Sequence, residues 1–251
     1  MKIIYQSNAG VILETDEIKM AIDLFCDAGD LPYTSVSTHI VKAVINREKP
    51  YEKIDYMLHT HKHMDHFNAE MVDKYLEEKG KAILIAPYGT LNQLTCSFFE
   101  REENIVVGIS VGEKEKIKIE NNGVSITAYD FKHEGNESAD EENIGYLIEL
   151  DGKRILHVGD ACISDENFKH TGLIDSKIDL LIAPFPYITR KDGLAIITKY
   201  IRPKKIAVVH LPAEEKDFCG WNRNAYKSAQ NIQNQFEDVV LFTKIGQELS
   251  I

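Results

Sequence analysis

The sequence has no long hydrophobic run. Nowhere in its 251 residues are there the roughly 18 to 20 uninterrupted apolar residues that a membrane-spanning helix needs. The first residues, Met1–Gln6, are too few to form the apolar core of a signal peptide. We therefore expect a cytoplasmic protein with no membrane span.

Cysteine is scarce, and its four positions lie far apart without any CxxC pair. This spacing excludes a cysteine-rich zinc knot and is unlike a disulfide framework. Reduced thiols in a reducing compartment are the expectation for Cys26, Cys96, Cys162 and Cys219.

Basic residues are also in deficit, with 29 Lys and Arg against 40 Asp and Glu and a net charge of −11. Such a charge repels a phosphate backbone over most of a surface, so no large nucleic acid is expected as a partner, although a local basic groove is not excluded. A small-molecule substrate is favoured. The sequence gives no indication of the oligomeric state.

The composition and length favour one folded α/β domain that spans residues 1–251. Short β-rich segments at Lys2–Gln6, Val11–Glu14 and Lys19–Ile22 predict antiparallel hairpins, and a helix is expected near 37–46. Strand and helix signals then alternate, as they do when helices pack on a sheet.

Two segments of the chain resemble each other. Gly10–Asp23 and Gly145–Asp160 each read as a hairpin whose second strand ends in an aspartate, and Asp151-Gly152 is a strong turn signal in the second. The repeat favours two similar β-halves, hence two facing sheets with helices outside. The alternative is chance, because alternating strands and turn residues are common.

A run of histidines follows the predicted buried strand Ile54–Leu58. Residues two apart in an extended segment point to the same side, so His61 and His63 are suited to bind one ion, while Asp65 and His66 follow at the turn toward a predicted helix, Ala69–Lys79. A lone histidine would most often be structural. Four candidate ligands within six residues indicate a metal site, because clustering them without an ion is costly.

This HxHxDH run, preceded by Thr60, resembles the signature of the metallo-β-lactamase superfamily. The later positions of that family are also filled: His133 follows the strand Val124–Tyr129, Asp160 closes a Gly-Asp pair, and His210 ends the strand Lys205–Val209. The resemblance covers nearly the whole chain. It implies an αββα sandwich, two facing mixed sheets with helices outside, and a binuclear metal site at one sheet edge.

The resemblance also implies a role for each ligand. One ion would be held by His61, His63 and His133, the other by Asp65, His66 and His210, with Asp160 bridging them and Asp23 supporting the site from behind. Electron-transferring di-iron relatives carry a carboxylate where this chain has His63, so the hydrolytic branch is indicated. The small, single-domain, lactonase-like group is the most similar one.

Such a pair of ions lowers the pKa of a shared water toward ~7 and polarises the bond under attack. Asp65 is expected to orient that water as well as to bind metal, and is the candidate catalytic residue. Imidazole and carboxylate ligands favour zinc, with manganese or iron as alternatives.

The substrate is the least constrained part of the prediction. Tyr187 and Arg190 lie in a segment that could bind an anionic substrate such as a sugar phosphate, although a solvated turn is an equal alternative. The loop Glu134–Asn143 is either a rim of the site or a solvated loop. Trp221 would be a wall of the site or part of the core.

The expected function is metal-dependent hydrolysis of a small cytoplasmic substrate: a lactone, ester or amide, with or without a phosphate group. One alternative is a phosphodiesterase acting on a nucleotide or a phospholipid head group. A second alternative, of another class, is a metal-binding protein without turnover.

Overall fold

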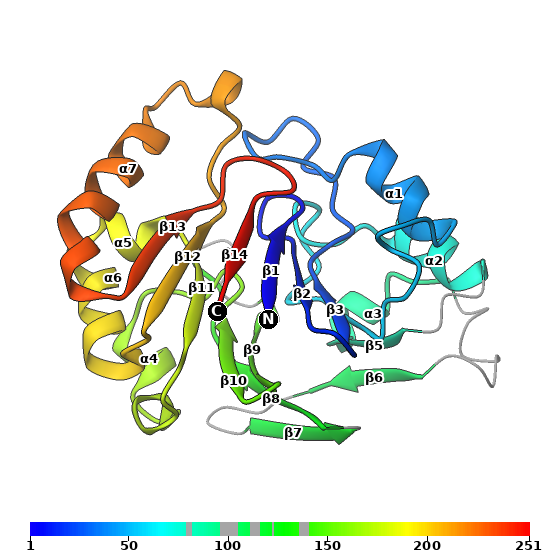
Figure 1. Cartoon of the computed structure of the whole chain (residues 1–251), viewed down its shortest axis with the longest axis horizontal. Coiled ribbons are helices and arrows are strands. Elements are labelled where there is room, and N and C mark those ends of the chain that lie inside the picture. The colour runs from blue at the N-terminus through cyan, green and yellow to red at the C-terminus, as the bar shows by residue number, and fades with distance from the viewer. Residues whose placement is uncertain (79–81, 96–104, 111–115, 122, 136–140) are drawn as a thin grey trace. The chain divides into compact units, whose positions relative to one another are not determined.

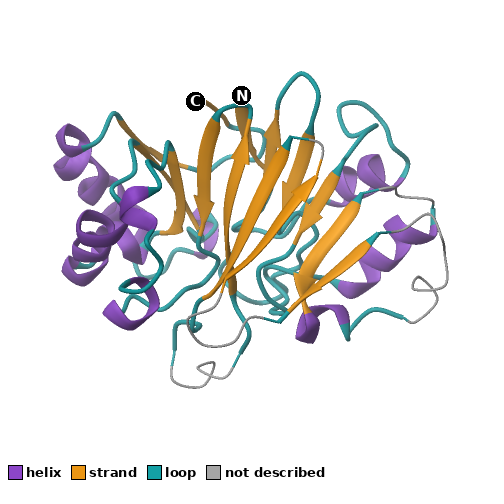
Figure 2. Ribbon diagram, turned by 90° about the horizontal axis from the view of Figure 1, so that it is seen from below, coloured by secondary structure: helices purple, strands orange, loops and turns teal. Residues whose placement is uncertain are grey.

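The computed structural model describes residues 1–78, 82–95, 105–110, 116–121, 123–135 and 141–251. It divides into two compact units, Met1–Ser110 with Lys244–Ser250 and Val111–Thr243 with Ile251. Each unit is built on its own sheet (Figures 1 and 2). The single domain expected from the sequence stays a prediction.

The first unit contains a seven-stranded mixed sheet among the described residues, in the order β14-β1-β2-β3-β4-β5-β6. Its four strands from β14 to β3 pair antiparallel, and those from β3 to β6 pair parallel. The strands are β1 (Lys2–Tyr5), β2 (Val11–Glu14), β3 (Lys19–Ile22), β4 (Tyr56–Leu58), β5 (Ile83–Pro87), β6 (Val106–Ile109) and β14 (Glu248–Ser250).

Helices α1 (Thr38–Ile45), α2 (Ala69–Glu77) and α3 (Tyr88–Leu91) belong to this unit. The first two begin at side-chain caps: Ser37 Oγ accepts from the backbone N–H of Ile40, and Asn68 Oδ1 accepts from that of Met71. Their apolar faces pack in one core with residues of the sheet. Because α2 is capped at Asn68, the histidine run that precedes it is held between a buried strand and a fixed helix start.

The second unit repeats this topology in the order β13-β12-β11-β10-β9-β8-β7. Its strands from β7 to β10 pair antiparallel, and those from β10 to β13 pair parallel. The strands are β7 (Lys116–Asn121), β8 (Val124–Asp130), β9 (Ile144–Leu150), β10 (Lys153–His157), β11 (Leu180–Pro184), β12 (Lys205–Val209) and β13 (Asp238–Leu241). The hairpins β2–β3 and β9–β10, whose likeness was visible in the sequence, therefore occupy matching places in two similar sheets.

Helices of the second unit lie against its sheet, with a core that unites residues of β10, β11 and β12 with residues of α6 and α7. The α-helices are α4 (Asp165–Phe168), α5 (Pro186–Thr189), α6 (Lys191–Ile196) and α7 (Trp221–Ile232). A π-helical turn follows α6 at Ile197–Ile201, and short 3-10 turns form at Leu173–Asp175, Glu214–Lys216 and Gln233–Gln235.

Several elements predicted from the sequence are confirmed, and the buried strand expected at Ile54–Leu58 is observed as the shorter β4. The strands expected at Val11–Glu14, Lys19–Ile22 and Lys205–Val209 have those bounds in the structure. The predicted helix Ala69–Lys79 is observed as α2 through Glu77, and its expected end at residues 79 and 80 lies outside the described residues.

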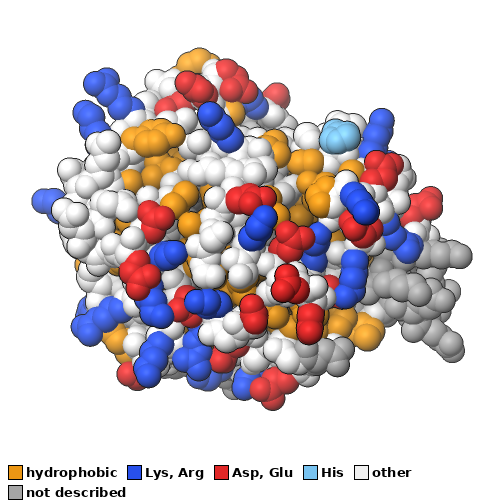
Figure 3. All heavy atoms as spheres, viewed as in Figure 1, with side chains coloured by type: hydrophobic (Ala, Val, Ile, Leu, Met, Phe, Trp, Pro, Cys, Tyr) orange, Lys and Arg blue, Asp and Glu red, His pale blue; other side chains and the backbone are white. Residues whose placement is uncertain are grey.

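None of the helices in the described ranges combines the length and the apolar character needed to cross a bilayer. On the face of the molecule shown in Figure 3, Lys and Arg side chains are interspersed with Asp and Glu.

Candidate metal centre

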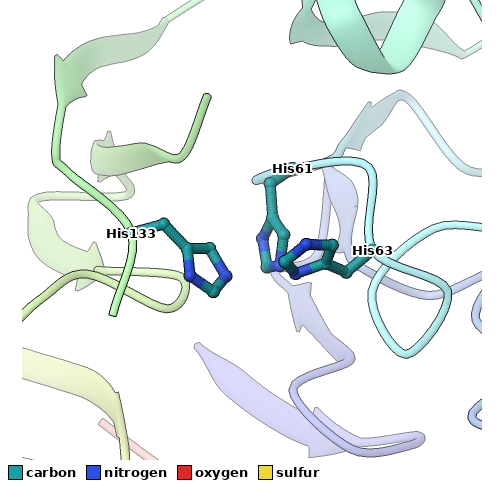
Figure 4. A group of neighbouring side chains, drawn as sticks. All are labelled: His61, His63 and His133. Carbon is teal, nitrogen blue, oxygen red and sulfur yellow. The ribbon is translucent and has the colours of Figure 1, made fainter. Parts of the chain in front are cut away.

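The first set of candidate ligands lies in the loop between β4 and α2. The loop turns tightly, because the backbone N–H groups of His66 and Phe67 both donate to the carbonyl of His63, over 2.9 and 2.8 Å. This turn brings the imidazoles together, with ring centroids 4.8 Å apart for His61 and His63 (Figure 4) and 4.1 Å apart for His61 and His66. His61 and His66 are fully buried, and His63 is partly exposed.

Asp23, at the end of β3, anchors this loop from inside the unit. Its carboxylate accepts from the backbone N–H of Thr60 (2.8 Å), the Thr60 hydroxyl (2.7 Å) and Nδ1 of His66 (2.8 Å). Since the Thr60 hydroxyl donates to Asp23, it can accept from Nδ1 of His61, which lies 3.0 Å away. Both rings therefore hold their Nδ1 protons toward acceptors, which makes Nε2 the nitrogen that would bind a metal.

Asp65 has a partner that the sequence did not reveal. The side-chain amide of Asn8 donates to the Asp65 carboxylate Oδ2 and to its backbone oxygen, both at 3.0 Å. Asn8 is fully buried and precedes the strand β2, so it fixes the carboxylate from a distant part of the chain. No sequence pattern marks Asn8 as a partner of Asp65, because a single asparagine in the Asn8-Ala9-Gly10 segment has no motif spacing that sets it apart from other turn residues.

The second set of candidate ligands follows β8, β10 and β12 of the other sheet. These strands run in the same direction, so their carboxyl ends reach the same edge, and His133, Asp160 and His210 lie just beyond them. The Asp160 Oδ2 atom is 3.7 Å from Nε2 of His133 and 3.2 Å from Nε2 of His210. One carboxylate oxygen thus faces two imidazoles.

Backbone and amide contacts fix the two loops that carry His133 and Asp160. The fully buried Asn143 accepts from the Asp160 backbone N–H (2.9 Å) and donates to the carbonyls of Phe131 and Val158. The Glu134 N–H donates to the Asp160 carbonyl (2.8 Å), and Nδ1 of His133 donates to the Glu134 carbonyl (2.6 Å). Asn143 was named in the sequence only as the end of a loop.

The donor chemistry of each set fits a divalent transition metal. Two ligand atoms bound about 2.0–2.1 Å from one tetrahedral ion lie about 3.3 Å apart. Within the units, the Nε2-to-carboxylate distances are 3.7 Å for His66 with Asp65, 3.7 Å for His133 with Asp160 and 3.2 Å for His210 with Asp160. These exceed the ~2.7–2.9 Å of a charge-assisted hydrogen bond and are close to the separation of co-ligands.

The two proposed substrate residues occupy different environments. Tyr187 is 1% exposed, and its hydroxyl donates to the Ala161 carbonyl at 2.9 Å, so it packs in the core beside the Asp160 loop. The Arg190 guanidinium is half-exposed and paired with Glu134 (3.0 Å) and Asp192 (2.6 Å). Of the two side chains, only that of Arg190 has its polar end toward solvent.

Glu134 connects Arg190 to the candidate ligands. Burial alone raises the pKa of its carboxyl, but hydrogen bonds from the Ile163 N–H, Cys162 and Arg190 outweigh burial and lower the pKa. Both described ends of the predicted rim loop Glu134–Asn143, Glu134 and Asn143, contact Asp160. Residues 136–140 of that loop lie outside the described residues.

The four remaining histidines and Trp221 lie outside the candidate ligand sets. His59 and His157 are fully buried, and burial lowers the pKa of His59. His39 and His170 are exposed. Trp221 stacks on Phe185, with ring centroids 5.5 Å apart, and remains 36% exposed.

Comparison with known proteins places the chain in a family. The family model of the Beta-lactamase superfamily domain matches residues 34–215, a range that includes all seven candidate ligands. The chain belongs to the beta-lactamase superfamily. The predicted family and fold, with two mixed sheets and helices, are confirmed, and the predicted enzyme class of metal-dependent hydrolase agrees with this membership. The lactonase-like group within the superfamily stays a prediction.

Individual superfamily relatives are distant in sequence. A UPF0173 protein of Pyrococcus abyssi is 26% identical over 214 residues, which is 84% of this chain and 83% of that protein. A possible metal-dependent hydrolase from Veillonella parvula aligns with a TM-score of 0.71 at 15% identity, over 100% of this chain and 99% of the other. The metallo-beta-lactamase fold protein YhfI from Bacillus subtilis aligns with a TM-score of 0.65 at 15% identity, over 99% and 98%. At these identities, the structural likeness shows the fold alone.

Proposed function

We propose that the two ligand sets together bind two divalent metal ions, zinc first and manganese or iron as alternatives. His61, His63 and His133 would hold one ion, and Asp65, His66 and His210 the other. Both trios are among the groups of His and Asp side chains that could hold a metal ion, and a third group joins Asp160 to His61 and His66. That third group supports Asp160 as the bridging ligand, because it shares one member with each trio.

The function that this site supports best is hydrolysis of a small lactone, ester or amide, with or without a phosphate group. This proposed function rests on a complete set of seven candidate imidazole and carboxylate ligands, with His63 among them, in a chain of the beta-lactamase superfamily. When bound, the ions would supply Lewis-acid activation of a water and of the bond under attack. Imidazole and carboxylate ligands of this kind are those that zinc accepts in catalytic sites.

Residues of the chain would orient the reactants. Asp65 is the proposed catalytic residue: with Oδ2 held by the Asn8 amide, its carboxylate has a fixed direction in which to accept a hydrogen bond from the attacking water. Asp23 would position His66 and the Thr60 backbone, and thereby keep Nε2 of His66 turned to the metal. The half-exposed Arg190 is the proposed contact for an anionic group of the substrate.

The test is turnover of an aryl ester, a γ-lactone and an aryl phosphodiester by zinc- or manganese-loaded protein, against the same protein stripped by a chelator. We expect chelator-sensitive hydrolysis of the ester or lactone, lost in H63A and D160A and retained in H170A, which alters an exposed histidine outside the ligand sets. Turnover of the phosphodiester alone would support the phosphodiesterase alternative. Two bound ions without turnover of any substrate would contradict the hydrolase and support a non-catalytic metal-binding protein.

A further inference from the structure

The second unit contains a pocket of about 600 Å³ at the edge of its sheet opposite the candidate ligands. Lys153, Asp179 and Lys204, at the starts of β10, β11 and β12, line it. Asp160 and His210 follow the other ends of β10 and β12. Since a strand rises about 3.3 Å per residue, the five residues of β10 alone separate the two edges by roughly 17 Å. The pocket is therefore distinct from the metal centre, and its volume suits a small molecule.

The carboxylates of this pocket hold part of its wall in place. Glu149 accepts from Nε of Arg154 at 3.1 Å. Asp179 accepts from the Arg154 backbone N–H at 2.9 Å and from Lys204 Nζ at 2.7 Å. Arg154 also donates to the Ser176 carbonyl at 2.9 Å. The positive charges of Arg154 and Lys204 are thus largely compensated by the Glu149 and Asp179 carboxylates.

Two further lysines line the pocket without such a hydrogen bond, and Lys153 still interacts electrostatically with the Asp179 carboxylate. The ammonium groups of Lys153 and Lys177 form no hydrogen bond or ion pair with the residues that the structure describes. The lining as a whole has four cationic and three carboxylate side chains, so it is cationic on a chain whose net charge is −11. Lys177 also has a left-handed backbone (φ 51°), a conformation that costs energy in a lysine and is concentrated at functional sites.

Ser125 also lines this pocket. Ser125 is paired across the strands with Glu149, which is paired in turn with Arg154, so the three side chains form one row on the sheet. The Ser125 Oγ atom is buried and makes no hydrogen bond within the described part of the chain.

We propose that this pocket binds a small metabolite through a phosphoryl group. The Lys153 and Lys177 ammonium groups would contact the phosphoryl oxygens. The anchored Arg154 and Lys204 contribute positive potential to the wall. This site is independent of the proposed hydrolase function, because it shares no residue with either ligand set.

The test is a titration of the metal-loaded protein with inorganic phosphate, followed by the backbone amide NMR shifts of the assigned protein. We expect saturable shifts in residues 149–154 and 177–179. K153Q/K177Q is expected to weaken the affinity at least tenfold. The matched control is K169Q/K227Q, which removes two exposed lysines outside the pocket and is expected to bind phosphate as the wild type does.

Three results would overturn the proposal. The first is an unchanged affinity in K153Q/K177Q when its spectrum shows an intact fold. The second is shifts confined to residues around His133, Asp160 and His210, which would place phosphate at the metal centre only. The third is an equal response to sodium chloride at the same ionic strength, which would show general screening rather than a site.

Discussion

Substitution of Asp23 by asparagine tests whether the anchor behind the histidine loop controls metal binding. The carboxylate accepts three hydrogen bonds within 2.8 Å and is fully buried. Asparagine has one acceptor oxygen and an NH₂ group, so at least one of the donors from Thr60 and His66 would face another donor. The left-handed backbone at this position (φ 46°) suits asparagine, which limits the change to the side chain.

The magnitude follows from the hydrogen bond to His66. A hydrogen bond to a charged group contributes about 1.5–3 kcal/mol. If the NH₂ group introduced by D23N faces Nδ1 of His66, the ring must move its proton to Nε2, the atom that would bind the metal. Residues that orient metal ligands typically alter affinity by about 10- to 100-fold. This range equals about 1.4–2.8 kcal/mol, which agrees with the loss of one such bond.

The assay is zinc affinity measured by chelator competition, with urea unfolding of the metal-stripped protein alongside. D73N is the matched control, because Asp73 is also a largely buried aspartate of the first unit, and its carboxylate accepts from the Thr95 N–H at 3.2 and 3.3 Å. We expect both variants to lose stability, and only D23N to lose zinc affinity. A zinc affinity of D23N within twofold of wild type would refute the assignment of Asp23.

Three further predictions concern contacts of known geometry. R190Q is expected to raise KM for an anionic substrate about two- to fivefold at constant metal content, because the Arg190 guanidinium is half-exposed. Loss of metal at constant KM would instead show that Arg190 acts through Glu134. N68A is expected to lower the free energy of unfolding by about 1 kcal/mol in urea, because it removes the cap of α2, and an unchanged value would contradict this role. At pH 8 a thiol reagent should modify the exposed Cys219 but not the buried Cys26. Burial raises the pKa of the Cys26 thiol to about 11, so about one molecule in a thousand carries the thiolate at this pH. Equal rates of modification at the two cysteines would contradict the buried environment of Cys26.

Local sequence patterns were enough to predict the elements that deliver the first ligand set. The apolar segment before His59 predicted the buried strand β4, and the helix predicted from Ala69 begins there as α2. Periodicity and capping depend only on neighbouring residues. The resemblance of the two hairpins also predicted a real feature, because β2–β3 and β9–β10 occupy matching places in the two sheets.

Residues that act over a long sequence separation were harder to predict. Asn8 reaches Asp65 across 57 positions, and Asn143 reaches Asp160 across 17, with no motif that links them. Tyr187 lies in a Pro-rich segment typical of a surface turn, but Pro186 begins the helix α5 and the ring packs into the core. Tertiary packing decides that Arg190 is exposed and Tyr187 is buried, and the local sequence pattern does not encode that packing.

The most direct test of the proposed binuclear centre is the metal content of the purified protein, measured by mass spectrometry of the ions per chain. We predict two ions in the wild type and in H170A, and at most one in H63A and in D160A. A wild type that binds no divalent metal, or an H63A/D160A double variant that keeps both ions, would contradict the account.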